Sequence, residues 1–173
     1  KPGPIVRELP KKYDDLIKKA VARWNCFAVW EMYWGQLYQE SKMDPNAVSE
    51  AHARGLAQFM AKTWNQITRE MNLGAADRSD VAASIEAGCY YGTKLRRIWK
   101  SPRPEEDRTN LVLASYNSGQ GNIIESQRLC GMPVLYEPIM VCLHLVTGDK
   151  NARETRTYAP LIRKWAAHKV AGG

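Results

Sequence analysis

One glutamate in this sequence stands where a carboxylic acid could act as a general acid. Trp30, Tyr33, Trp34 and Leu37 recur at three- and four-residue spacing, which predicts one apolar face of a helix, and Glu40 continues that face. Aromatic surroundings and the negative end of the helix dipole both raise the pKa of a carboxyl group placed there. An acid that stays protonated near neutral pH is what general-acid cleavage of a glycosidic bond requires. A partly exposed glutamate at a helix end is the alternative that this pattern leaves open.

The elements around Glu40 predict a mainly α fold. Pro45 ends the helix that carries Glu40, and the loop that follows contains many turn-forming residues. Periodic apolar positions predict further helices at 13–24, from about 61 to Gly74, at 80–99 and at 105–116, then a short helix, an apolar helix that begins near Pro138 and a final amphipathic helix around 161–165. The pattern allows at most a small β hairpin, between residues 47 and 59. Small residues at 82–92 predict that another helix approaches closely there.

Length and composition predict one globular domain over residues 1–173. With 173 residues and 45% hydrophobic content, the chain can bury one substantial core. The longest apolar run, 139–146, is too short to span a bilayer, so we expect a buried helix there and not an integral membrane protein. The chain starts without Met and without an apolar signal region, so we expect a mature product or a piece of a longer protein.

The charge of the chain favours a polyanionic partner. The net charge is +7, with seven Lys/Arg against three Asp/Glu in residues 1–24 and six against one in residues 150–169. Nucleic acid, an anionic membrane and a cell wall that bears carboxylates would all attract such ends. No nucleic-acid-binding motif is recognisable, so we do not expect nucleic acid as the partner.

Cysteine and histidine spacing does not favour a metal site. Cys26, Cys89, Cys130 and Cys142 form no Cys-x-x-Cys pair, and the three histidines show no ligand spacing. Four cysteines could form two disulfides in three ways. Because Cys89 and Cys142 both lie in apolar helical patterns, we expect free, buried thiols.

Four separated stretches resemble the soluble (SLT-type) lytic transglycosylases, which have a lysozyme-like fold. They are Gln-Glu-Ser at 39–41 followed by Met-Asp-Pro-Asn-Ala at 43–47 and Ser49, Gly-Leu-Ala-Gln-Phe-Met at 55–60, Ala-Ser-Tyr-Asn-Ser-Gly at 114–119, and Glu-Thr-Arg-Thr-Tyr at 154–158. They occur in the family's order, and the motif-bearing core covers about residues 26–165. Ala57 and Ala61 depart from the Met and Pro that the family often has at these positions.

The resemblance implies cleavage of the β-1,4 bond between N-acetylmuramic acid and N-acetylglucosamine in peptidoglycan. Glu40 would act first as acid and then as base, without a cofactor or a metal, and the product would end in 1,6-anhydromuramic acid. Tyr116 would hydrogen-bond Glu40 and orient it. Ser49, Gln58 and Met60 would line the groove around the sugar that is cleaved.

The resemblance assigns supporting roles to four more residues. Ser41 would fix the end of the Glu40 helix, and Asn117 would hold the neighbouring loop. Glu154 would contact the saccharide or the peptide stem. Tyr158 would pack near the Glu40 helix.

Two other functions fit the same fold. A hydrolytic muramidase (lysozyme) would need a second carboxylate to position water, and Asp44, Glu50 and Asp77 are candidates. A catalytically silent wall-binding or virion structural module would not need a buried acid. We expect a monomer that acts on peptidoglycan glycan strands in the periplasm or elsewhere outside the cytoplasm. Compact size and basic ends favour a phage lysin whose ends bind anionic envelope material.

Overall fold

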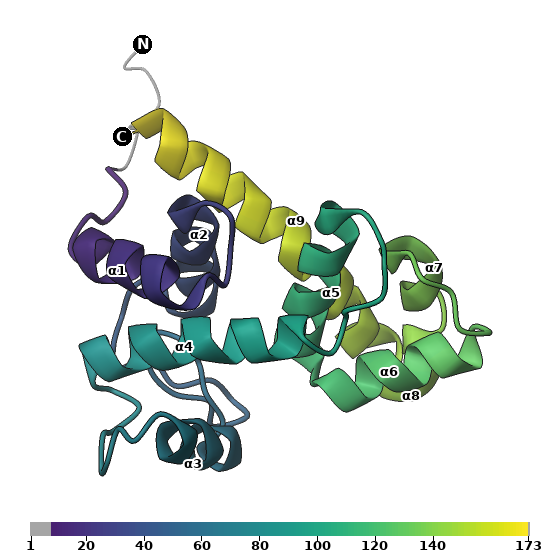
Figure 1. Ribbon diagram of the computed structural model, residues 1–173, viewed down its shortest axis with the longest axis horizontal. Helices are drawn as coiled ribbons and strands as arrows, with labels where there is room; N and C mark the ends of the chain where they lie inside the picture. The colour runs from purple at the N-terminus through teal and green to yellow at the C-terminus, as the bar shows by residue number, and fades with distance from the viewer. Residues whose placement is uncertain (1–7, 173) are drawn as a thin grey trace.

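The computed structural model describes residues 8–172, which form a mainly helical domain (Figure 1). In chain order the helices are α1 (Asp14–Trp24), α2 (Trp30–Ser41), α3 (Ala61–Glu70), α4 (Val81–Arg96), α5 (Glu105–Ser118), α6 (Gln120–Leu129), α7 (Tyr136–Met140), α8 (Leu143–Thr147) and α9 (Asp149–Gly172). Within residues 8–172 there is no strand, and two isolated bridges, Val48 with Arg54 and Arg54 with Phe59, occur where the sequence allowed a hairpin. The predicted fold class is confirmed.

The buried side chains form two clusters where the sequence predicted one core. The larger cluster joins α1, α2 and α3 to one half of α4, and the smaller one joins the other half of α4 to α6, α7 and α8. Helices α4, α5 and α9 contribute side chains to both clusters. Figure 1 shows α9 running along the molecule from the α7 and α8 side to the α1 and α2 side. These three helices therefore hold the two halves together.

The apolar run at 139–146 was predicted as one buried helix, and this prediction was wrong. The run is divided between α7 and α8, which are five residues each. Ile139, Met140 and Leu143 are buried, whereas Val141 is 58% exposed and Leu145 is 66% exposed. Within this run, the two single-turn helices bury three apolar side chains and leave Val141 and Leu145 at the surface, an outcome that the apolar composition alone does not reveal.

The last helix is longer than the sequence predicted because it continues through a proline. Helix α9 has 24 residues and contains Pro160, which lacks the N–H needed for one helical hydrogen bond. Tyr158, Ala159 and Ile162 around this proline are buried in the larger cluster. Burial of this face against α2 is the compensation that keeps α9 continuous.

The expected free thiols are instead two disulfides. Cys26 lies between α1 and α2 and is bonded to Cys89 of α4, with their Cα atoms 5.2 Å apart. Cys130, which follows α6, is bonded to Cys142, which precedes α8, with their Cα atoms 5.8 Å apart. An apolar helical environment fits a thiol and a disulfide equally well, so only the packing of α1 on α4 and of α6 on α8 brings the partners within bonding range.

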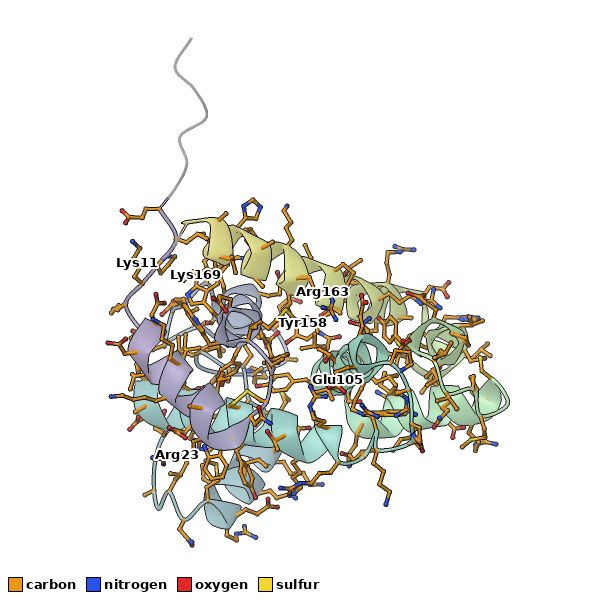
Figure 2. All side chains as sticks on the ribbon, turned by 45° about the horizontal axis from the view of Figure 1, so that its top comes forward. Lys11, Arg23, Glu105, Tyr158, Arg163 and Lys169 are labelled. Carbon is orange, nitrogen blue, oxygen red and sulfur yellow. A yellow bond between two sulfur atoms is a disulfide. The ribbon has the colours of Figure 1, made fainter. Side chains whose placement is uncertain are left out.

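A buried lysine joins the end of α9 to the start of the described chain. The ammonium of Lys169 lies 3.0 Å from the Asp14 carboxylate and donates to the Pro10 carbonyl at 3.1 Å. It also lies over the ring of Trp34, 4.9 Å from the centroid. Lys169 is only 2% exposed, and Figure 2 shows it near Lys11. The ion pair and the carbonyl satisfy the buried charge.

Gly88 confirms the predicted close approach to α4 and gives a test of the packing. A Cβ atom at Gly88 would lie 2.4 Å from the Tyr33 hydroxyl and 3.1 Å from the Ala57 Cβ. We expect Gly88→Ala to lower the free energy of unfolding by about 1–3 kcal/mol, because Tyr33 must move. Thermal unfolding measures this. Gly121→Ala is the control, since nothing lies within 4 Å of its Cβ, and a similar loss in both variants would contradict the packing argument.

Candidate active site

Helix α2 places Glu40 one residue before its end. Tyr33, Trp34 and Leu37 are buried on the predicted apolar face. Lys42 then adopts a left-handed backbone (φ 53°) that ends the helix, and its N–H donates to the Tyr38 carbonyl. The helix therefore stops before Pro45 is reached.

The end of α2 is fixed by its own side chains and by α9. The Ser41 hydroxyl donates to the Leu37 carbonyl at 2.9 Å. A Cβ atom at Gly35 would lie 2.7 Å from the Ile162 carbonyl oxygen, so the glycine lets α9 lie directly against α2. This close contact sets the position of Glu40 relative to the residues of α9.

Glu40 keeps its proton at neutral pH. Desolvation by burial is the largest effect on the pKa of its carboxyl, and the nearby charge of Glu154 also raises this pKa, which lies at about 8. A hydrogen bond from Tyr158 opposes both effects. The residue as a whole is half-buried. The direction of the shift is the one predicted from the sequence.

Tyr158 is the aromatic side chain that hydrogen-bonds Glu40. It is 3% exposed, and Figure 2 shows it on α9 in the middle of the molecule. The amide of Gln36 donates to its hydroxyl at 3.3 Å. Sequence reasoning missed Gln36, although its position four residues before Glu40, on the same helix face, was a usable signal.

The hydrogen bond predicted from Tyr116 to Glu40 is not formed. The Tyr116 hydroxyl donates to the Ala57 carbonyl at 2.7 Å. Burial holds the Tyr116 pKa well above its usual value, and the charge of Glu40 adds to this shift, so the two groups are near each other. This hydrogen bond joins α5 to the 55–60 loop. It also satisfies the Ala57 carbonyl oxygen, which would be costly to bury without a partner.

Ser49 and Gln58 hold the loop in front of the site by hydrogen bonds. The Ser49 hydroxyl accepts from the Ala53 N–H at 3.0 Å. The Gln58 amide nitrogen donates to the carbonyls of Ala47 and Gly55, at 3.1 and 2.8 Å. Their polar side chains are therefore engaged with the loop backbone.

Met60 and Arg78 lie next to this loop. Met60 is 47% exposed just before α3, where it is free to contact a ligand. The Arg78 guanidinium donates to the carbonyls of His52 and Phe59, at 3.1 and 2.9 Å. Arg78 was not among the predicted residues, since nothing in the local sequence links it to a loop about 20 residues earlier.

A polar cavity of about 290 Å³ lies beside the site, between the α5–α6 turn and the start of α9. Seven polar side chains and one valine line it: Asn117, Ser118, Asn122, Val146, Thr147, Asn151, Glu154 and Thr155. The Thr155 hydroxyl donates to the Asn117 side-chain oxygen at 2.7 Å, which joins α5 to α9. Two predicted residues, Asn117 and Glu154, therefore meet in one cavity.

None of the three carboxylates considered for a hydrolase, Asp44, Glu50 and Asp77, is among the groups that shift the Glu40 pKa. Asp44 accepts the Asn46 N–H at 2.9 Å, and Asp77 accepts the N–H and hydroxyl of Ser79, all in exposed turns. The carboxylate that raises the Glu40 pKa is that of Glu154. Within residues 8–172, no group of three acidic, histidine or cysteine side chains could hold a metal ion, and no helix has the length and apolar character needed to cross a membrane.

The fold is that of the lysozyme-like lytic transglycosylases. A crystal structure of an inactive Glu-to-Gln mutant of the lytic transglycosylase Slt from Pseudomonas aeruginosa superposes with a TM-score of 0.72 and 18% identity. The alignment covers 95% of this chain and 25% of that one. At this identity the likeness shows the fold.

The chain belongs to the family of the transglycosylase SLT domain, whose model matches residues 29–131. The membrane-bound lytic murein transglycosylase F of Desulfosudis oleivorans is 34% identical over 125 residues, which is 72% of this chain and 26% of that protein. The protein of the same name from Alcanivorax borkumensis is 30% identical over 148 residues, 83% of this chain and 30% of that protein. The resemblance in the motifs is confirmed, and the chain spans less than a third of these relatives.

Proposed function

We propose that this chain is a peptidoglycan lytic transglycosylase that cleaves the β-1,4 bond between N-acetylmuramic acid and N-acetylglucosamine. The observation that carries the proposal is the Glu40 carboxyl, whose pKa of about 8 keeps the transferable proton in place near neutral pH. Family membership and relatives named as lytic murein transglycosylases support this function. A wall-binding module would gain nothing from such a group, because a desolvated carboxyl destabilises the fold when it ionises.

Glu40 serves as both acid and base in the proposed reaction. Its carboxyl gives a proton to the glycosidic oxygen as the bond from that oxygen to C1 of the muramic acid breaks. The substrate's own acetamido group stabilises the cation that develops. The C6 hydroxyl then attacks C1 and returns its proton to Glu40, which closes a 1,6-anhydro ring without water.

The neighbouring residues position this acid and enclose the sugar. Tyr158, held by Gln36, orients the carboxyl of Glu40. The loop fixed by Gln58 and Tyr116 forms the wall of the groove, and Met60 contacts the sugar face. Fixed walls of this kind hold the C6 hydroxyl near C1 and keep water away.

The products of a peptidoglycan digest test the mechanism. We expect muropeptides that end in 1,6-anhydromuramic acid, each lighter by one water than a hydrolysis product and inert to borohydride. Mass spectrometry separates the two. Predominantly reducing ends would overturn the transglycosylase reaction and make Glu154 the candidate for positioning a hydrolytic water, since it is the carboxylate that acts on Glu40.

The raised pKa predicts how the rate depends on pH. Cleavage should fall as the pH rises through about 8, because Glu40 then loses the proton that it must donate. Glu154→Gln removes a charge that helps to raise this pKa, so the alkaline limb should move to lower pH. Initial rates of wall clearing across this range measure both effects. The exposed Glu50 gives the control Glu50→Gln, and an equal movement of the limb in both variants would refute the assignment to Glu154.

The cell wall is the proposed site of action, in the periplasm or elsewhere outside the cytoplasm. Two disulfides support this, because such bonds persist in oxidising compartments. The basic carboxyl-terminal helix would attract anionic envelope material. The first seven residues of the basic amino-terminal segment lie outside the described residues. A monomeric state, the absence of a nucleic-acid partner and a phage lysin origin stay predictions.

A further inference from the structure

The turn that follows Glu40 has a backbone conformation that residues with side chains seldom adopt. Lys42 (φ 53°) and Met43 (φ 63°) are consecutive residues in the left-handed region, and neither is glycine. This region is unfavourable for them because it brings the Cβ atom too close to a carbonyl oxygen. Such a turn persists only where surrounding contacts hold it, so these contacts decide how α2 ends.

Two aromatic rings on different helices hold the side chain of Lys42. Its ammonium lies 4.6 Å from the centroid of the Tyr38 ring on α2 and 4.7 Å from that of the Trp165 ring on α9. The two rings pack edge to face, with their centroids 4.9 Å apart. A cation in this place is attracted to the electron-rich faces of the rings. Met43 is held differently, by burial in the larger cluster.

Trp165 also bonds the residue directly before Glu40. Its indole N–H donates to the Gln39 side-chain oxygen at 2.9 Å. Trp165 therefore contacts side chains one position before and two positions after the acid. Tyr158, which hydrogen-bonds Glu40, lies two turns earlier on the same face of α9. Helix α9 thus grips the last turn of α2 at two separate points.

We propose that Trp165 is a positioning residue for the cleavage reaction, an inference that rests on the proposed function. It holds the last turn of α2 against α9 and keeps the left-handed turn closed, which fixes the direction of the Glu40 carboxyl. Without this contact the end of α2 would fray, and water would reach the carboxyl. Glu40 would then lose both its position and its desolvation.

Trp165→Leu tests the proposal, because it removes the ring and the N–H but keeps an apolar side chain. The pKa of Glu40 should fall from about 8 towards its ordinary value of 4.5. The titratable groups that face Glu40, which are Glu154 and Tyr158 of α9 and Tyr116 of α5, are unchanged in this variant. NMR titration of isotope-labelled glutamate carboxyls measures the pKa. With soluble peptidoglycan fragments as substrate, kcat should fall about tenfold, because a misplaced catalytic group loses rate.

Trp24→Leu is the matched control. Trp24 is a second half-buried tryptophan of the larger cluster, and its N–H donates to Glu86 while its ring packs edge to face on Tyr90, both on α4. This variant should also lose thermal stability, but the Glu40 pKa and kcat should not change. Equal effects of the two variants on this pKa and on kcat, or no effect of either, would overturn the proposal.

Two substitutions at the exposed Lys42 test the turn itself. Lys42→Ala removes the ammonium and should lower kcat, because alanine still finds the left-handed backbone unfavourable. Lys42→Gly removes the same ammonium but adopts that backbone without strain, so it should restore most of the lost rate. Equal rates in these two variants would contradict the holding role. The Glu40 pKa is measured without substrate, so it tests the positioning even if the unmodified protein cleaves no peptidoglycan, a failure that would overturn the proposed function alone.

Discussion

Glu40→Gln should lower the rate of wall cleavage by roughly 10³-fold, because general acids contribute about 10²–10⁴ to such reactions. The substitution preserves the shape of the side chain and removes the proton that it transfers. Rates of wall clearing with purified peptidoglycan measure the loss. Glu50→Gln, which changes an exposed carboxylate in the loop, should leave the rate unaltered.

The same variant should be at least as stable as the unmodified protein in alkali. The folded-state pKa of Glu40, about 8, lies above its ordinary value of 4.5, so its favourable contribution to stability is complete below pH 4.5 and is lost as the pH rises through about 8. Glutamine does not ionise, so the variant does not lose this stability as the pH rises. Thermal unfolding at alkaline pH measures the difference. A variant that is inactive but also less stable would attribute the lost activity to misfolding, and a variant with full activity would remove Glu40 from the mechanism.

Loss of the Cys26–Cys89 disulfide should lower the free energy of unfolding by roughly 4 kcal/mol. The bond closes a loop with a sequence separation of 63 residues, and the entropy that it removes from the unfolded chain grows with loop length. For a domain of this size, Cys26→Ala with Cys89→Ala should lower the melting temperature by about 10 °C. Calorimetry of the paired variant measures the change.

The second disulfide gives an internal comparison. Cys130 and Cys142 are separated by only 12 residues, so their paired alanine variant should lose roughly 3 kcal/mol, less than the first pair. Thiol labelling after denaturation without reductant should find no free cysteine. Four labelled thiols, or a melting temperature that does not respond to reductant, would contradict both bonds.

Local sequence patterns predicted the helices well and the contacts between helices poorly. The spacing of Tyr33, Trp34 and Leu37 determines a helix face, because each side chain direction follows from the 3.6-residue period. Pairing of Cys26 with Cys89 depends instead on how α1 packs against α4, which no short segment specifies. The continuity of α9 through Pro160 depends in the same way on burial against α2.

The candidate site shows the same division. Glu40 was predicted because its helix face and its chemistry are both local properties of the sequence. The tyrosine that hydrogen-bonds Glu40 could not be predicted from local sequence. Tyr116 and Tyr158 lie on different helices, and both come near Glu40. Only the three-dimensional arrangement assigns Tyr158 to Glu40 and Tyr116 to the Ala57 carbonyl.

The contacts of Lys169 with Pro10 and Asp14 bring the two ends of the described chain close together. Lys169 follows Tyr158 by three turns of α9, a distance of roughly 16 Å along the helix axis. Sequence joined before residue 8 or after residue 172 would therefore meet the described part of the chain at one corner, away from Glu40. In a longer protein, the segments on both sides would leave from the same place on the surface. They could be lengthened or exchanged without passing in front of Glu40.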